Sequence, residues 1–258
     1  MSLQLNEFID FANSLADTAS KTSMHYFRNN LSIENKDDES PVTIADKETE
    51  KLIRNQIRDR YPNHGILGEE YENENIDAEF IWVIDPIDGT RSYIAGHKDF
   101  GNLISLLHNN KPVLGIINCP AHNERWIGIK NKNTTCNKVE VTCSDINQIK
   151  NAYVFSSGIY FDEPIIRKGW KAIKEKARYY RLGGDCYMYG MLASGLIDIV
   201  VEDTLKAHDY MALINVVEGA GGKISDKYGE PITLKSDGSL VASSSEVLHN
   251  EIIELINK

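Results

Sequence analysis

The sequence predicts an α+β protein that contains two β-sheets of different type. Three observations lead to this prediction. The N-terminal segment carries apolar side chains at helical spacing, residues 80–143 alternate short apolar runs with turn signals, and residues after about 145 alternate strand-like with helix-like segments. Strands joined by turns form an antiparallel sheet, whereas strand–helix–strand units form a parallel one, so a chain with both patterns needs two sheets.

The first part of the chain is predicted to open with two helices, at about 3–28 and 45–60. Phe80 to Ile84 form an apolar run that is typical of a buried strand. This strand is predicted to end at Asp85, because Pro86 cannot donate to a ladder. Four further strands complete the meander, at 103–107, 113–118, 126–129 and 139–141.

After about residue 145 the pattern changes to an alternation of strands and helices. Strands are predicted at 152–156, 178–181, 197–202 and 240–244, and helices at 164–176, 186–195, 209–219 and 246–257. The change of pattern divides the chain into an N-terminal half, residues 1–145, and a C-terminal half, residues 146–258, with no flexible linker between them.

The composition excludes several classes of protein. The 258 residues include 28 basic and 38 acidic side chains, and the net charge of −10 argues against nonspecific nucleic-acid binding. The four cysteines form no Cys-x-x-Cys pair, which indicates reduced thiols in a cytoplasmic protein rather than a zinc or redox site. No apolar stretch approaches the length of a membrane span, and the N-terminus lacks the features of a signal peptide.

We expect structural roles for the histidines and tyrosines that lie outside the acidic motifs described next. The six histidines without paired spacing are expected on the surface or in turns, at positions 25, 64, 97, 108, 122 and 249. Tyr179, Tyr180, Tyr187 and Tyr189 are expected in the core or an interface. A base-stacking surface is not expected there, because no cluster of Arg or Lys accompanies these rings.

The segment from Asp85 to Thr90 carries the chemistry of the first half. Its sequence Asp-Pro-Ile-Asp-Gly-Thr holds Asp85 and Asp88 on a sharp turn, followed by the backbone N–H groups of Gly89 and Thr90. A solvated Asp-rich loop is the alternative interpretation. However, two carboxylates about 4 Å apart repel by roughly 4 kcal/mol at an effective dielectric constant near 20, so fixing both beside a buried strand favours a bound cation. The amide donors that follow suit an anion.

Further acids occur in similar contexts elsewhere in the chain. Glu69 and Glu70 follow the short apolar run Ile66-Leu67-Gly68, and Asp46 lies at the start of the helix predicted at 45–60. Asp209 lies in the first turn of a helix that ends at glycines, where the helix dipole favours an anion. Each of these acids taken singly is typical of a helix N-cap or a surface charge.

Together these segments resemble the inositol monophosphatase family, the lithium-sensitive magnesium phosphatases, over nearly the whole chain. The motifs that carry the resemblance are Gly68-Glu69-Glu70, the run from Trp82 to Thr90, and the Asp209 helix that ends in Glu218-Gly-Ala-Gly-Gly222. The resemblance implies a layered α-β-α-β-α sandwich. It places the metal-binding motifs in the first half of the chain and the substrate contacts, with the last metal ligand, in the second half.

The resemblance also implies a role for each of these residues. The implied magnesium ligands are Glu69, Asp85, the carbonyl of Ile87, Asp88 and Asp209, which would hold two or three ions, and lithium is expected to inhibit. Glu69, Thr90 and Asp46 are the implied catalytic residues, of which Thr90 and Asp46 would orient or deprotonate the attacking water. The substrate is expected to contact Asp88, Gly89, Thr90 and Asp209, with the N–H groups of Gly89 and Thr90 on a phosphate oxygen. For Thr90, a helix N-cap is the alternative role.

The implied substrate is histidinol phosphate. Gly183-Gly-Asp185-Cys-Tyr187 and the segment from Glu202 to Asp209 resemble the histidinol-phosphate phosphatase branch of the family. Asp185 and Glu202 would supply anionic partners for the ammonium and imidazole groups of that substrate. The structural alternatives are a helix N-cap for Asp185 and a surface acid for Glu202.

Other functions of the same scaffold stay open at this point. One alternative is a phosphatase for inositol phosphate, a sugar phosphate or a nucleotide-derived phosphate, and another is a regulatory binding protein. The family resemblance implies a homodimer in the cytoplasm, and the small phosphorylated substrate is expected without nucleic-acid or membrane partners.

Overall fold

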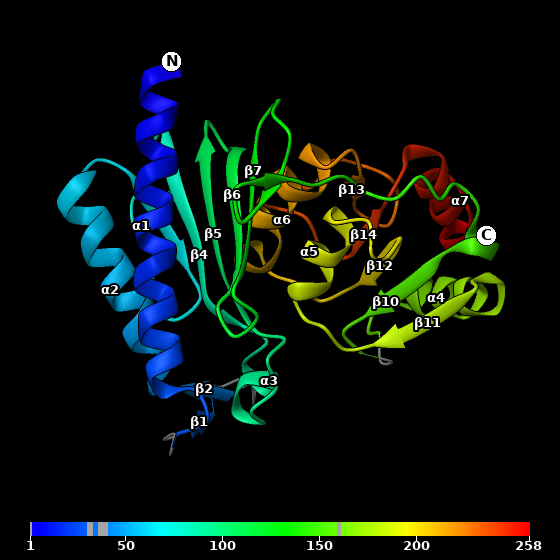
Figure 1. Cartoon of the computed structure of the whole chain (residues 1–258), viewed down its shortest axis with the longest axis horizontal. Helices are drawn as coiled ribbons and strands as arrows, with labels where there is room; N and C mark the ends of the chain where they lie inside the picture. Colours follow the sequence, from blue (N-terminus) through cyan, green and yellow to red (C-terminus); the bar gives the residue numbers. More distant parts are fainter. Residues whose placement is uncertain (1, 30–32, 36–40, 159–160) are drawn as a thin grey trace.

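The protein forms five layers that follow one another across the molecule (Figure 1). The computed structural model describes residues 2–29, 33–35, 41–158 and 161–258. Two helices cover the outer face of a first sheet, two helices lie between that sheet and a second one, and two helices cover the far face of the second sheet (Figure 1). This order is the predicted α-β-α-β-α sandwich.

The first sheet is the predicted antiparallel meander with one parallel strand added at its edge. Its strand order is β3-β4-β5-β6-β7-β8-β9. The bounds are β3 (Gly65–Gly68), β4 (Phe80–Asp88), β5 (Gly101–His108), β6 (Lys111–Cys119), β7 (Glu124–Ile129), β8 (Thr135–Cys136) and β9 (Val139–Glu140). The sequence patterns did not indicate β3, which pairs parallel with β4, or the two-residue strand β8.

The prediction that the strand at 80–84 ends at Asp85 is wrong. Strand β4 continues to Asp88, and its register against β5 breaks between Asp85 and Asp88. Pro86 lies within this irregularity, where the missing N–H removes no regular ladder bond. Both faces of β4 are buried, because Trp82 and Ile84 pack toward the outer helices while Ile81 and Val83 pack toward the inner ones. This double burial explains the continuous apolar run.

The second sheet contains the predicted parallel strands and two antiparallel ones. Its strand order is β11-β10-β12-β14-β13, in which β10 pairs parallel with β11 and with β12. The bounds are β10 (Tyr153–Ser156), β11 (Tyr179–Leu182), β12 (Ile199–Glu202), β13 (Lys223–Ser225) and β14 (Leu240–Ser243). Strand β13 was not predicted. A short pair, β1 (Ile33–Asn35) and β2 (Pro41–Thr43), lies outside both sheets.

Apart from α3 and a 3-10 turn, which were not predicted, the helices agree with the predicted positions to within a few residues. They are α1 (Ser2–Tyr26), α2 (Ile44–Arg60), α3 (Thr90–Ile94), α4 (Pro164–Lys176), α5 (Tyr187–Ala193), α6 (Ala207–Gly219) and α7 (Glu246–Asn257), with a 3-10 turn at Ile149–Asn151. No helix in the described part of the chain is long and apolar enough to cross a membrane.

Helix α6 is the central element of the molecule, since it lies between the two sheets (Figure 1). Its residues from Tyr210 to Val217 are all buried, as expected for a helix covered on every side. Two glycines of the first sheet allow it to lie unusually close. A Cβ added at Gly115 would lie 2.0 Å from the carbonyl oxygen of Ala212, and one at Gly128 would lie 2.2 Å from the backbone of Asn215. The sheet therefore sets the position of α6 through backbone contact.

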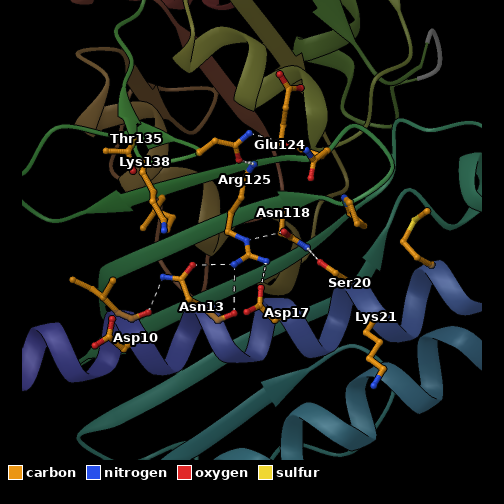
Figure 2. A pocket seen from close by; sticks show the side chains of 16 residues that line it. Asp10, Asn13, Asp17, Ser20, Lys21, Asn118, Glu124, Arg125, Thr135 and Lys138 are labelled. Carbon is orange, nitrogen blue, oxygen red and sulfur yellow. Dashed lines mark hydrogen bonds and ion pairs between the residues drawn. The ribbon is translucent and has the colours of Figure 1, made fainter.

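Hydrogen bonds attach α1 to strands β6 and β7 of the first sheet, beside a cavity of about 1100 Å³ (Figure 2). Arg125 of β7 donates to Asn118 at 2.8 Å, to the side chain of Asn13 at 3.0 Å and to Asp17 at 2.7 Å (Figure 2). The Arg125 guanidinium thus joins β6 and β7 to α1, and these bonds use most of its N–H donors.

The expectation for one histidine needs correction. His249 was expected on the surface or in a turn, but it is buried on α7, where its ring nitrogens contact Ser225 at 2.7 Å and Ser243 at 3.3 Å. Tyr189 is buried in the core as expected, whereas Tyr179 and Tyr180 are more than half exposed and lie outside the core.

Candidate functional site

Three carboxylates from two distant segments of the chain meet where the two halves face each other. Asp85 and Asp88 come from the end of β4, and Asp209 comes from the first turn of α6. One oxygen from each side chain lies within 4.8 Å of the other two. Asp85 is buried, with 2% of its surface exposed. The structure therefore brings together three of the five residues that were predicted to bind metal.

Local hydrogen bonds hold the irregular end of β4, on which Asp85 and Asp88 lie. The N–H group of Ile87 donates to Asp85 Oδ1 at 3.0 Å, and Asn102 Nδ2 donates to the carbonyl of Pro86 at 2.7 Å. Gly89 follows with a φ of +80°, a conformation that glycine adopts without strain. A Cβ at Gly89 would also lie 2.8 Å from Cγ of Asp185, so only glycine leaves room for that side chain.

The second half of the chain supports the same acids. The backbone N–H of Cys186 donates to Asp88 Oδ2 at 2.6 Å. Asp209 Oδ2 accepts the backbone N–H of Lys206 at 2.6 Å and so caps its own helix. Its Oδ1 lies 3.5 Å from Nε2 of the buried His208. The three acids are thus held from both sides of the site.

Glu69 and Glu70 are positioned by a buried acid that the sequence patterns did not single out. Glu50 of α2 accepts the backbone N–H of Glu69 at 3.0 Å and that of Glu70 at 2.8 Å through Oε2. Its Oε1 pairs with Arg54 Nε at 2.7 Å. The carboxylate of Glu69 is close enough to raise the pKa of Asp85. The only sequence signal for Glu50 is its position four residues before Arg54, the spacing of an ion pair on one helix face. This spacing does not show that the pair is buried.

Asp46 and Thr90 form a second pair beside the acids. Asp46 Oδ2 accepts the backbone N–H of Thr43 at 2.9 Å and its hydroxyl, which completes a capping box at the start of α2. The Thr90 hydroxyl lies 3.4 Å from Asp46 Oδ1 and 3.1 Å from the carbonyl of Ile87. Thr90 is the first residue of α3 and Gly89 is its N-cap, so the alternative role of Thr90 as the N-cap is wrong.

The electrostatics of this cluster favour a cation. Burial raises the pKa of Asp85 well above its ordinary value, and Glu69, Asp88 and Asp209 raise it further by repulsion. Burial also raises the pKa of Asp88, and that of Asp46 to about 6. Burying several acids together is costly unless a positive charge compensates them. The donor atoms are oxygens only, which is the set that Mg²⁺ prefers, so the residues fit a magnesium site.

A pocket of about 170 Å³ opens directly beside the acids and includes both predicted specificity residues. It is lined by Asp88, Ser157, Asp185, Cys186, Tyr189, Glu202, Leu205, Asp209 and Leu213. Glu202 is buried at the end of β12, so it is not the surface acid of the structural alternative. It accepts the hydroxyl of Tyr189 at 2.6 Å and that of Ser157, and burial raises its pKa to about 7.

Asp185 approaches the site from the loop between β11 and α5. Its backbone is left-handed, with a φ of +42°, and its Oδ2 accepts the hydroxyl of Ser92 at 2.5 Å. The N-cap of α5 is Cys186, so Asp185 does not cap this helix as the structural alternative required. Ser92, Ser157 and Tyr189 were not predicted, because their roles depend on contacts between segments far apart in the sequence.

Comparisons with known proteins agree on one family. The profile described as "Inositol monophosphatase family" matches residues 4–258. The "Bifunctional phosphatase IMPL2, chloroplastic" of Arabidopsis thaliana is 38% identical over 247 residues, which cover 95% of this chain and 71% of that protein. The "Histidinol-phosphatase" of Chlorobaculum parvum is 33% identical over 251 residues and 96% of each chain. A solved inositol monophosphatase from Zymomonas mobilis has a TM-score of 0.89 and 38% identity, and the match covers 98% of each chain.

Proposed function

The chain belongs to the inositol monophosphatase family, and we propose that it is a Mg²⁺-dependent phosphomonoesterase that hydrolyses histidinol phosphate to histidinol and phosphate. The observation that carries the proposal is the juxtaposition of two groups of acids. Asp85, Asp88 and Asp209 cluster within 4.8 Å, and Asp185 and Glu202 line the adjoining pocket with two of these acids. The first group suits a divalent cation, and the second suits a cationic organic group.

In this proposal, Glu69, Asp85, the carbonyl of Ile87, Asp88 and Asp209 hold the metal. Bound Mg²⁺ supplies Lewis-acid stabilisation of phosphate charge and makes an attacking water more acidic. The backbone N–H groups of Gly89 and Thr90 follow the turn directly and donate to a phosphate oxygen. Asp85 and Asp88 keep their positions through the hydrogen bonds from Ile87 and Cys186.

Thr90 and Asp46 provide a route for the proton of the attacking water. The Thr90 hydroxyl accepts that proton at Oγ1 while it donates its own to Asp46 Oδ1, which lies 3.4 Å away. The pKa of Asp46, raised to about 6 by burial, is close to that of an effective base near neutral pH. Capping bonds to Oδ2 hold this carboxylate, so Oδ1 is the atom that faces Thr90.

Asp185 and Glu202 supply the substrate preference in this proposal. Histidinol phosphate carries an ammonium and an imidazole, which form charge-assisted hydrogen bonds to carboxylates. A cationic group beside Glu202 would lower the raised pKa of that residue and favour its charged form. Inositol phosphate is the second candidate, because a solved structure at 38% identity is described as an inositol monophosphatase. A neutral polyol, however, needs only hydrogen bonds at this position.

A substrate panel tests the proposal. Initial rates of phosphate release are measured with histidinol phosphate, inositol 1-phosphate and glycerol 2-phosphate, with Mg²⁺ and with excess chelator. We expect the highest kcat/KM for histidinol phosphate and no turnover in chelator. Turnover that persists in chelator would contradict the metal site, and a preference for inositol phosphate would contradict the substrate alone.

Asp185→Asn separates recognition from catalysis. It should lower kcat/KM for histidinol phosphate by roughly 10- to 100-fold, the scale of a hydrogen bond to a charged group. Hydrolysis of glycerol 2-phosphate should change little. Asp77→Asn removes the same charge at an exposed position and serves as the matched control. Equal losses on both substrates would show that Asp185 acts through the fold rather than on the substrate.

A further inference from the structure

Glu202 is a buried acid whose partners differ in kind from those of Glu50, another buried glutamate. The Glu202 carboxylate accepts the hydroxyl of Tyr189 at 2.6 Å and that of Ser157. Glu50, by contrast, pairs with the guanidinium of Arg54 and accepts two backbone N–H groups. In the described part of the chain, hydroxyl groups are the only hydrogen-bond donors to Glu202. These residues therefore orient the charge of Glu202 without an ion pair.

The pocket that Glu202 lines contains acids and no basic side chain. Its four carboxylates belong to Asp88, Asp185, Glu202 and Asp209. Asp88 and Asp209 are part of the proposed metal cluster, where a bound cation balances their charge. Asp185 has the same kind of support as Glu202, because its Oδ2 accepts the hydroxyl of Ser92 at 2.5 Å. Two acids of the pocket are thus held by neutral hydroxyl groups.

Hydroxyl donors suit a carboxylate that binds a cation from outside the protein. A Lys or Arg side chain in their place would compete with the cationic group of the substrate for the same oxygens. A hydroxyl fixes the orientation of the carboxylate but uses only one of its acceptor sites, so the others remain open. Burial raises the pKa of Glu202, and the bonds from Ser157 and Tyr189 act in the opposite direction. The two hydroxyls therefore favour the charged form that a cation needs.

Packing around α5 sets the position of the Tyr189 hydroxyl. Tyr189 is 1% exposed, and it reaches from α5 to the end of β12. A Cβ added at the next residue, Gly190, would lie 2.7 Å from the ring of Trp126 on β7. The Nε1 of Trp126 donates to Ser194, directly after α5, at 2.8 Å. Because the helix lies this close to β7, the first sheet sets where Tyr189 meets Glu202.

We propose that Tyr189 is a positioning residue for substrate selection, which with Ser157 holds Glu202 toward the pocket and so sets the preference for a cationic over a neutral phosphate ester. This inference rests on the proposed function, because it requires a substrate with a cationic group. Tyr189 acts through Glu202 rather than on the reacting phosphate. Loss of its hydroxyl should therefore weaken binding of the cationic ester and leave a neutral ester unaffected.

Tyr189→Phe tests this role, because it removes one hydroxyl and keeps the ring in the core. The KM for histidinol phosphate should rise about tenfold while kcat stays within about twofold, since a hydrogen bond to a charged group is lost in binding. The kcat/KM for glycerol 2-phosphate should stay within about twofold. Tyr187→Phe is the matched control on the same helix. Its hydroxyl donates to Glu124 at 2.8 Å, and neither residue lines the pocket, so both substrates should react as before.

A double-mutant cycle shows whether Tyr189 acts through Glu202. Glu202→Gln removes the charge and keeps the shape, and it should lower kcat/KM for histidinol phosphate by about 10- to 100-fold. Adding Tyr189→Phe should then cost about twofold or less, because the charge that the hydroxyl supports is gone. Additive losses, or equal losses on both substrates from Tyr189→Phe, would overturn the proposal in favour of a structural role. Should Tyr189→Phe not fold, Ser157→Ala is held to the same results, because its hydroxyl donates to the other carboxylate oxygen.

The same measurements separate this inference from the proposed function. A wild type that does not prefer histidinol phosphate over glycerol 2-phosphate would overturn the proposed function, and this inference with it. A wild type whose preference disappears in Glu202→Gln but persists in both Tyr189→Phe and Ser157→Ala would overturn this inference alone. A preference that survives Glu202→Gln would also overturn it, because Tyr189 would then have no selective charge to position.

Discussion

Replacing Gly115 by alanine should weaken the proposed metal site without changing any of its residues. The added Cβ would lie 2.0 Å from the carbonyl oxygen of Ala212, whereas ordinary contacts begin near 3.4 Å. The added Cβ is fixed to the backbone of β6 and meets backbone atoms of α6, so no side-chain rotation can relieve the clash. Helix α6 must therefore move away from the sheet by roughly 1 Å. Asp209 lies one turn before Ala212 on this helix, so it moves with the helix while Asp85 and Asp88 stay on β4.

The expected effect of this shift follows from the geometry that Mg²⁺ demands. The ion needs ligand distances of about 2.0–2.1 Å, and a misplacement of about 1 Å can cost on the order of 100-fold in rate. We expect kcat/KM to fall by that factor and the Mg²⁺ concentration for half-maximal activity to rise. Overpacking should also lower the free energy of unfolding by about 1–3 kcal/mol. Activity is measured across a Mg²⁺ titration, and stability by urea unfolding.

Gly128→Ala is the comparison that makes the test specific. It presses on the backbone of Asn215, nearly two turns beyond Asp209, where the Cβ would lie 2.2 Å away. A similar loss of stability is expected, with a smaller change in the Mg²⁺ requirement. If Gly115→Ala folds and keeps the wild-type Mg²⁺ dependence, the sheet does not position Asp209 through this contact and the reasoning fails.

Four further changes test other parts of the structure. Asp85→Asn should nearly abolish turnover while far-ultraviolet circular dichroism stays unchanged, because a charge is lost but little volume. Thr90→Ala should lower kcat by about 100-fold with little change in KM, the range of general acid–base help; a rise in KM alone would show that Thr90 only positions phosphate. Burial lowers the pKa of His249 to about 4, so this residue contributes fully to stability above pH 6.5 and up to about 3 kcal/mol less toward pH 4; the difference in urea-unfolding free energy between the wild type and His249→Gln should follow this profile. Arg125→Ala should lower the thermal midpoint by a few degrees, because it removes the bonds to Asn13 and Asp17 that hold α1 to the sheet.

The sequence predicted most of the fold because the patterns are long and locally determined. The apolar runs of β5, β6 and β7 and the periodic α1 and α2 needed only periodicity and turn residues. Strand β4 was predicted too short, since Pro86 ends a regular ladder but is accepted in the irregular stretch between Asp85 and Asp88. The strands β3, β8 and β13 read Gly-Ile-Leu-Gly, Thr-Cys and Lys-Ile-Ser, so none of them holds more than two large apolar side chains that would mark a strand.

The candidate site was predictable where one motif carries its residues and unpredictable where distant segments meet. Asp85, Asp88 and Gly89 share one motif, and Asp209 stands at a recognisable helix start. By contrast, the bonds from Ser92 to Asp185 and from Ser157 to Glu202 join residues 93 and 45 positions apart. Neither serine lies in a motif, so only the folded chain shows what they hold.

Several acids of the site also fold the segment that presents them. Asp46 completes the capping box of α2, Asp209 caps α6, and Asp85 binds the amide two residues ahead, whereas Glu69 is held through its backbone by Glu50. Under the proposed function, selection on Asp46 and Asp209 acts twice, once through activity and once through folding. Replacing either acid should therefore cost stability as well as turnover, because each accepts a backbone N–H at the start of its own helix.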